Sequence, residues 1–301
     1  MGIRAPAPHT LSYRIPENKD TPNRHNHSSL PGLSHGIICY SVMSFFMRAP
    51  ARLGRATRRF FAEFGETAIL FGNSARYLPR IVRDRRLLFD QMEHIGTDSI
   101  PLVVVIGFFT GMVSAWQAAY QFKGIMPLSF LGAAVSRAIF IELGPVLTAI
   151  IIAGRVGASI AAEIGTMKVT EQIDALESLA ISPVRYLALP RILAAIIMMP
   201  PLVVFANTIA LGGAFLVSNF FLGITAKTFF DSVQQYFHLG DVIGGLTKAF
   251  FFGGVTALIG VQVGFNASGG AEGVGNATIR AFVLSSASIL ILDYVLWTVL
   301  F

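Results

Sequence analysis

The chain has 301 residues, of which 53% are hydrophobic and only 13% are charged, and its formal net charge is +6. Soluble domains carry roughly 25% charged residues, so this composition excludes an ordinary soluble enzyme and predicts an integral membrane protein. The positive charge lies mainly in the N-terminal third, which favours anionic lipid headgroups over nucleic acid as the partner. The single cysteine, Cys39, cannot form a disulfide within the chain.

Residues 1–42 form a segment rich in Pro, Ser, Asn and His, without a hydrophobic period. This composition is typical of a disordered leader, and it lacks the apolar core of a secretory signal. Most of the histidines fall here, and a floppy leader explains them better than a metal site does. We expect either a disordered leader or a mis-assigned start, with Met43 or Met47 as the candidate first residue.

Residues 43–96 are predicted to form an interfacial region around one amphipathic helix. Between residues 52 and 80, apolar side chains recur on one helical face and charged side chains on the other. A basic helix with a phenylalanine-rich face is typical of the membrane–water interface, where it lies flat. The alternative is a soluble helix packed on a core. The apolar face comprises Leu53, Phe60, Phe64, Ala68, Phe71, Ala75 and Leu78.

Residues 97–301 are predicted to form a permease domain with five membrane-spanning helices. A crossing helix needs about 20 apolar residues, and three stretches of at least that length carry no charge. The third span is long, so we expect it to tilt or to break near Pro200 and Pro201. The predicted fold is an all-α membrane protein with five transmembrane helices preceded by an amphipathic interfacial helix. The expected spans are 100–122, 128–160, 186–221, 242–264 and 278–301.

The distribution of Lys and Arg orients these spans. Most arginines precede the first span, and Lys168, Arg185 and Arg191 lie between the second and third spans. The connections on the opposite side offer only Lys123 and Lys227. By the positive-inside rule, the N-terminus and the connection between spans two and three face the cytoplasm.

The connection at residues 163–183 concentrates charge in a chain that is otherwise short of it. A simple turn needs far fewer residues, so the segment indicates a docking surface for a soluble partner. The alternative is a solvated loop whose charges only keep it out of lipid. The candidate docking residues are Glu163, Gly165, Lys168, Glu171, Asp174 and Glu177.

Within this connection the sequence predicts a short amphipathic helix. Thr170 is expected to cap its start, and Pro183 follows its end. Ile173, Leu176 and Ala180 share its apolar face.

Several ionisable residues fall inside the predicted spans. Such residues are costly in lipid and normally face a cavity, a partner or water. In one interpretation, Arg137 or Lys248 contacts a lipid phosphate in a central pathway. In the other, the charges pair with one another and fix helix packing, for instance Glu142 with a neighbouring arginine. The set comprises Arg137, Glu142, Arg155, Lys248 and Asp293.

Small residues form a further pattern. Gly154, Gly157, Ala158 and Ala161 mark a face on which helices can approach closely, either within the chain or in a homodimer. The glycine-rich stretch 269–275 superficially resembles a phosphate loop, but no strand precedes it, so a cytoplasmic turn between spans four and five is the better interpretation. No Gly-Lys-Ser/Thr motif occurs, and we predict no catalytic residues and no metal site.

Several motifs follow one another between about residue 60 and the end of the chain. Together they resemble the signature of the MlaE/YrbE permease family, the membrane subunits of ABC-type lipid transporters linked to MCE-domain proteins. Relatives commonly have an arginine directly before the ELGP motif, where this chain has Ile141. Arg137, one helical turn earlier, is the candidate substitute. The matching motifs are ELGP at 142–145, AGRVG at 153–157, AEIGTM at 162–167, TEQIDALE at 170–177, Pro183, Pro190, Arg191 and GGAEGVG at 269–275.

The resemblance implies a permease subunit that moves phospholipids or other lipids between membranes, as a homodimer. It implies a separate ABC ATPase that binds ATP and Mg, with residues 163–183 as the coupling segment. It also implies an MCE-domain protein on the outer side and often a STAS-domain subunit. No cofactor is expected in this chain. The implied location is the bacterial inner membrane with a cytoplasmic N-terminus, and the chloroplast inner envelope, with a plastid transit peptide, is the weaker alternative.

Two other functions stay open at this stage. An ion-driven secondary transporter usually shows internal repeats, which are not evident here. A membrane scaffold that anchors an MCE protein without transporting anything would not need charges inside its spans. Neither the transported lipid nor the direction of transport is predicted.

Overall fold

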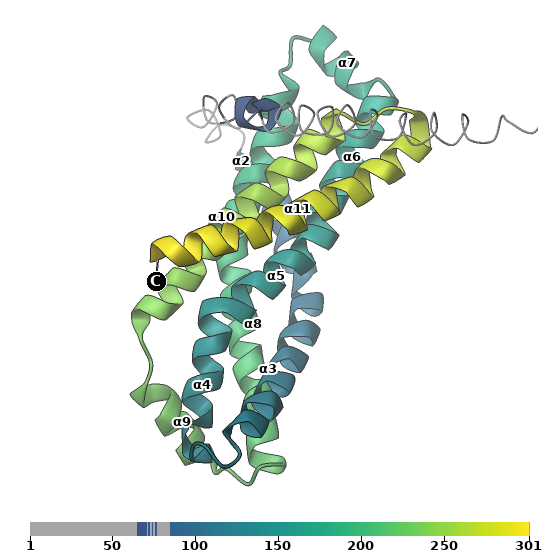
Figure 1. Ribbon diagram of the computed structural model, residues 1–301. Coiled ribbons are helices and arrows are strands. Elements are labelled where there is room, and N and C mark those ends of the chain that lie inside the picture. The colour runs from purple at the N-terminus through teal and green to yellow at the C-terminus, as the bar shows by residue number, and fades with distance from the viewer. Residues whose placement is uncertain (1–64, 71, 73, 75, 77–84, 301) are drawn as a thin grey trace, which may run out of the picture. The chain divides into compact units, whose positions relative to one another are not determined.

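The computed structural model describes residues 65–70, 72, 74, 76 and 85–300 (Figure 1). All regular elements in these residues are helical. The predicted fold class is confirmed, because five helical segments are long and apolar enough to cross a membrane. These are Arg85–Phe122, Leu128–Val169, Val184–Phe220, Leu239–Phe265 and Gly270–Leu300. The expected leader at 1–42 and most of the expected interfacial helix at 52–80 lie outside the described residues.

The first two spans are each built from several consecutive helical pieces. The first contains α2 (Arg85–Ile95), the 3₁₀ turn η2 (Thr97–Ser99) and α3 (Ile100–Phe122). The second begins with the 3₁₀ turn η3 (Leu128–Phe130) and α4 (Leu131–Ala138). It continues through the π-helical turn η4 (Ile139–Leu143), α5 (Gly144–Ile152), the π-helical turn η5 (Ala153–Gly157) and α6 (Ala158–Val169). π-Helical turns are rare and occur frequently at functional sites.

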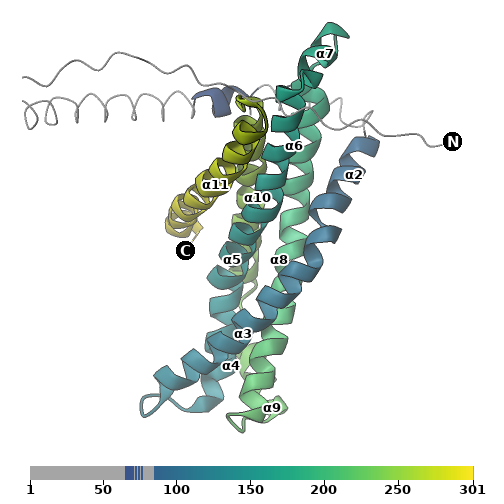
Figure 2. The same ribbon diagram turned by 90° about the vertical axis from the view of Figure 1, so that its right-hand side faces the viewer.

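The short helix α7 (Gln172–Ser178) follows, and the third span combines the π-helical turn η6 (Val184–Ala188) with α8 (Leu189–Phe220). The remaining helices are α9 (Ala226–Gln235), α10 (Leu239–Phe265) and α11 (Gly270–Leu300). Figure 1 and Figure 2 show α7 and the turn between α10 and α11 at one end of the bundle, and α9 at the opposite end. α11 crosses the bundle obliquely, so its C-terminal half approaches the middle of span two.

Spans one, two and five are longer than expected, span one beginning already at Arg85, and of the two alternatives for span three, tilt or a break, the break is absent. α8 runs through Pro200 and Pro201 without a break, although each proline removes one helical hydrogen bond. The adjacent Met199 and Leu202 are buried, and their packing holds the helix together there. Span two extends to Val169, so residues 163–169 continue the helix instead of starting a loop. The fifth span already starts at Gly270, so most of the glycine-rich stretch is helical.

Small residues let α3 and α8 pack with their backbones in contact. On α3 the buried positions recur every four residues, and they include Gly107, Gly111, Ala115 and Ala119. A Cβ atom at Gly111 would lie 1.8 Å from the carbonyl oxygen of Ala210 on α8. Close backbone approach through small residues is the main way in which membrane helices associate, because lipid provides little hydrophobic drive.

Gly111→Ala is therefore expected to destabilise the protein by about 1–3 kcal/mol, because α3 and α8 must separate to admit the methyl group. The measurement is the melting temperature in detergent, followed by size-exclusion chromatography. Gly212→Ala is the matched control on α8, since a Cβ atom there would have no neighbour within 4 Å. Equal melting temperatures for the two variants would contradict this account of the packing.

The small-residue face predicted in span two packs within the same chain. A Cβ atom at Gly260 of α10 would lie 2.7 Å from the carbonyl oxygen of Gly157. Ala161 belongs to a buried cluster that includes Ala267, from the turn after α10, and Ala281 on α11. Packing inside the protomer thus accounts for this face.

Candidate functional site

The centre of the candidate site is an ion cluster formed by three spans around a buried lysine, in which the side chain of Glu142 is 41% exposed. Nζ of Lys248 on α10 lies 2.7 Å from Oε2 of Glu142 in η4 and 2.8 Å from Oδ1 of Asp293 on α11. The side chain of Lys248 is 0% exposed, and its ammonium lies 5.0 Å from the centroid of the Trp297 ring. One lysine thus bridges two carboxylates at the level where α11 crosses span two.

The sequence suggests a neighbouring arginine as one possible partner of Glu142. The structure shows a different partner. The actual partner is Lys248, 106 residues away in the sequence. The π-helical turn η4 places Glu142 there, since its wider turn changes the direction of the side chains relative to those of α4. Three of the five predicted intramembrane charges therefore meet in one cluster, and they hold η4, α10 and α11 together.

A fourth predicted charge, Arg137, lies beside this cluster. Its Nε atom is 2.8 Å from Oδ2 of Asp241, a residue in the first turn of α10 that the sequence analysis missed. The side chain of Arg137 is 51% exposed, whereas that of Asp241 is 10% exposed. The sequence signal for Asp241 was a carboxylate at the start of an apolar segment. A carboxylate in the first turn of a helix also interacts favourably with the positive end of the helix dipole.

An open pocket joins these two groups of charges. Its volume is about 380 Å³, within the usual range for small-molecule sites. The pocket has a guanidinium at its edge, the ion cluster at its base and two aromatic rings along its side. Its lining residues are Arg137, Ala138, Ile141, Glu142, Asp293, Tyr294 and Trp297.

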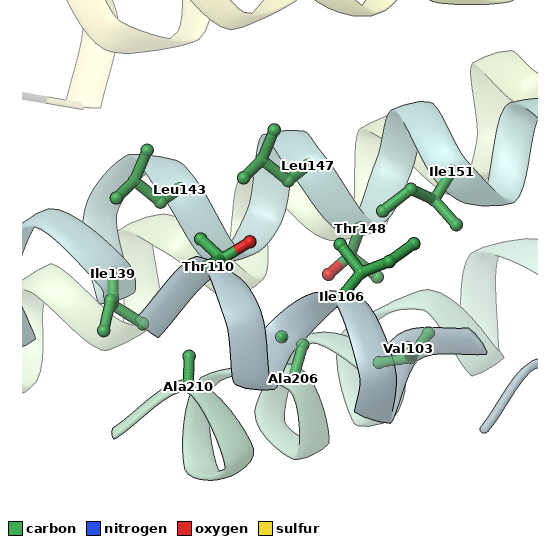
Figure 3. A pocket seen from close by; sticks show the side chains of 12 residues that line it. Val103, Ile106, Thr110, Ile139, Leu143, Leu147, Thr148, Ile151, Ala206 and Ala210 are labelled. Atoms are coloured by element: carbon green, nitrogen blue, oxygen red, sulfur yellow. The ribbon is translucent and has the colours of Figure 1, made fainter. Parts of the chain in front are cut away.

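A second, narrower crevice lies between α3, α5 and α8 (Figure 3). Its walls are aliphatic, and Thr110 and Thr148 contribute the only side-chain oxygens among the residues that line it. Next to the crevice, Oδ1 of the buried Asn207 is aimed at Gly144, where a Cβ atom would lie 1.7 Å from it. The volume of the crevice is only about 20 Å³, enough for about one water molecule, so its apolar walls are nearly in contact.

The fifth predicted charge, Arg155, lies at the other end of span two, in η5. Nη1 of Arg155 donates to the carbonyl of His94 at 3.3 Å and to the hydroxyl of Ser99, and Nη2 lies 3.7 Å from Oδ2 of Asp98. Arg155 therefore joins span two to the junction between α2 and α3. It takes no part in the pocket that Arg137, Glu142 and Asp293 line.

The predicted docking residues divide into two groups. Glu171, Asp174 and Glu177 are exposed on α7 or directly before it, with Lys168 3.0 Å from Asp174 at its base. Glu163 and Gly165 lie on α6, where Glu163 is half-buried and Gly165 is buried. Gly165 is buried against Ala267 and Val274, and Oε2 of Glu163 is 2.9 Å from Nη2 of Arg191. The role of all six residues in docking stays a prediction.

The predicted cap of α7 is wrong, although the helix exists. Thr170 ends α6: its hydroxyl donates back to the carbonyl of Thr166 and accepts from the side chain of Gln172, and it makes no cap bond to a backbone amide of α7. Glu171, in a left-handed conformation with φ 61°, is the N-cap instead.

The apolar face of α7 is only partly as predicted. Ile173 is buried and Leu176 is half-buried, whereas Ala180 is exposed. Ala180 adopts φ 58°, and the next amide, Ile181, donates to the carbonyl of Leu176. This pattern ends a helix in the Schellman manner.

Together these features define a class of protein. A pocket lined by charged and aromatic residues lies between spans two and five of five membrane-spanning segments, and an exposed acidic helix stands at one end of the bundle. A polytopic membrane protein has this arrangement.

Comparison with known proteins makes the class specific. Residues 88–299 match the family described as Permease MlaE. The chain is 44% identical over 215 residues to a probable ABC transporter permease protein of Rickettsia typhi, covering 71% of this chain and 83% of the relative. It is 32% identical over 250 residues to the intermembrane phospholipid transport system permease protein MlaE of Haemophilus influenzae, covering 83% and 96%. It is 33% identical over 211 residues to the chloroplastic protein TRIGALACTOSYLDIACYLGLYCEROL 1 of Arabidopsis thaliana, covering 70% and 60%.

The chain therefore belongs to the MlaE permease family. It is a multi-pass membrane protein and an ABC transporter permease, as the resemblance indicated.

Proposed function

We propose that this chain is the permease subunit of an ABC transporter that moves phospholipids between membranes and binds the lipid headgroup in the pocket beside α11. The proposal rests chiefly on the composition of that pocket. Arg137 is half-exposed at its edge, and its contact with Asp241 uses only Nε of a guanidinium that has five N–H donors. The remaining donors suit a phosphate, which arginine binds in a forked geometry. The relative from H. influenzae is named as a phospholipid transport permease, which supports this choice of substrate.

The energy for transport would come from a separate ATPase chain, which would hold the ATP and Mg²⁺. The exposed helix α7 is its proposed docking element. The buried Ile173 fixes α7 to the bundle, while three carboxylates and the 70% exposed Leu179 remain available to a partner. An apolar anchor surrounded by charge is a common composition for a specific interface.

A second copy of the chain is the proposed partner of α11. Only 11% of the most apolar window of α11 is buried, against 22–50% for the other four spans. Its exposed side carries large apolar side chains close to the pocket. A homodimer through this surface would enclose the pocket between two protomers. The exposed residues include Ile279, Val283, Leu290, Ile291 and Tyr294.

The remaining partners and the location follow from the family. We place the protein in the bacterial inner membrane with the N-terminus and α7 in the cytoplasm, because the lysines and arginines gather at that end. An MCE-domain protein would then bind at the opposite end, near α9, and a STAS-domain subunit would join the ATPase. The chloroplast inner envelope is the alternative location, suggested by the chloroplastic relative.

The proposal is tested by purifying the chain from its own cells in mild detergent and identifying what accompanies it by mass spectrometry. A stoichiometric P-loop ATPase, an MCE-domain protein and bound phospholipid are expected. Reconstituted with these partners, the complex should move a fluorescent phospholipid only when ATP is present.

Other outcomes would favour the two alternative functions. A lysine held between two carboxylates inside a span is also the kind of group found in proton pathways. A chain that purifies alone in several detergents, and transports in response to an ion gradient, would therefore replace the proposal with an ion-driven transporter. A complete complex that moves no lipid would indicate a scaffold.

A further inference from the structure

A second ion network lies at the α7 end of the bundle, far along span two from the pocket. His94 on α2 is central to it: Nδ1 is 3.0 Å from Oδ2 of Asp98, and Nε2 is 3.7 Å from Oε1 of Glu163. Asp98 also faces Arg155, and Glu163 also faces Arg191. These five residues, called here the inner network, connect α2, η2, η5, α6 and α8.

The inner network is partly withdrawn from solvent. Ser99, which accepts from Arg155, is fully buried, and Arg191 is 9% exposed. Nη1 of Arg191 also donates to the carbonyl of Leu187, so both terminal nitrogens of its guanidinium have a hydrogen-bond partner. The side chains of His94, Asp98 and Glu163 are 45%, 49% and 40% exposed, so solvent screens their contacts, and the Glu163–Arg191 pair is anchored on its Arg191 side alone.

On one side, the inner network meets the two segments that support α7. Glu163 lies on α6, the helix that leads into α7, and Arg191 lies at the start of α8, the helix that follows it. The pair Glu163–Arg191 therefore closes the base of the projecting helix. Any movement of α7 driven by a docked ATPase reaches these two side chains first.

On the other side, the inner network meets both walls of the apolar crevice. Asp98 and Ser99 form the turn directly before α3, which lines the crevice with Val103, among others. Arg155 lies in η5, directly after α5, which forms the facing wall. At its other end α5 follows η4, where Glu142 enters the ion cluster of the pocket.

We propose that the inner network transmits the movement of α7 to α3 and α5, with Asp98 and Arg155 as positioning residues that set the separation of the crevice walls. This rests on the proposed function, because it assumes that an ATPase moves α7. Glu163 and Arg191 receive the displacement, His94 passes it to Asp98, and Arg155 applies it to span two at a π-helical turn, a kind of irregularity at which helices kink. Loss of the inner network leaves the ATPase bound and active, but ATP hydrolysis then no longer drives lipid movement.

The test compares Asp98→Asn, which removes the charge at constant shape, with Asp98→Glu, which keeps the charge. In the reconstituted complex, Asp98→Asn is expected to lower phospholipid moved per ATP hydrolysed by about tenfold, with ATPase binding and hydrolysis retained. Asp98→Glu should recover most of the loss, and Arg155→Gln should reproduce it. Asp231→Asn, an exposed site on α9, is the matched control and should transport normally.

A distance measurement gives an answer that does not depend on transport. Spin labels at Phe89 on α2 and Leu179 after α7, both exposed, are placed in a variant without Cys39. Trapping the ATPase with ADP and vanadate should change the distance between the two labels by different amounts in the parent and in Asp98→Asn, because in the variant α2 no longer follows α7. Identical shifts together with an unchanged ratio of lipid to ATP would overturn the proposal. A parent complex that hydrolyses no ATP or moves no lipid would instead overturn the proposed function.

Discussion

Lys248→Met is expected to abolish lipid transport and to cost about 3–5 kcal/mol of stability, which is the usual effect of removing one partner from a buried ion pair. The methionine fills much of the volume of the lysine stem but leaves Glu142 and Asp293 facing each other without a cation. Two carboxylates at such a short distance repel one another in a low-dielectric environment, so η4 and α11 should separate. The pocket would then lose its base.

The measurement pairs thermal melting in detergent with ATP-dependent phospholipid transport after reconstitution. Lys227→Met is the matched control, since it makes the same chemical change at an exposed site in the first turn of α9. The double variant Glu142→Gln with Lys248→Met should melt at a higher temperature than Lys248→Met alone, because it leaves one carboxylate instead of two. Transport at the parent rate in Lys248→Met would exclude the ion cluster from the transport pathway.

Glu171→Lys and Asp174→Lys are expected to reduce transport at least about tenfold while the protein still inserts and folds. Both side chains are exposed at the start of α7, so reversing their charge leaves the bundle intact but places a cation where the ATPase would meet a carboxylate. Asp174→Lys also loses the contact with Lys168, but that pair is exposed and contributes little to stability.

The measurement is co-purification of the ATPase with each variant, together with transport in proteoliposomes. Less ATPase should be recovered with each variant, and its yield should fall further as salt is lowered, because like-charge repulsion strengthens when screening weakens. Asp231→Lys reverses the same kind of charge on α9, at the opposite end, and should retain the ATPase. Full assembly and normal transport in both α7 variants would show that the ATPase binds elsewhere.

The sequence by itself determined the number and approximate limits of the spans, because span length is set by bilayer thickness and is readable from local hydropathy. It also located α7, since a cluster of charged residues between two apolar segments must lie outside the membrane. Both properties depend on residues close together in the chain. Boundaries governed by competing local bonds were less predictable, as Thr170 shows: its hydroxyl donates to the helix before it and accepts from the side chain of Gln172, not from a backbone amide of α7.

Only the tertiary structure decided how the charges inside the spans are paired. Lys248 meets Glu142 across 106 residues, and Arg137 meets Asp241 across 104. Neither pairing can be deduced from spacing along one helix, because it depends on how α10 packs against span two and, for Glu142, on the change of side-chain direction at η4. For the same reason Arg155, which the sequence grouped with the pocket charges, belongs to the inner network. The side chain that each charge meets is set by how the helices cross, and local sequence does not encode that crossing.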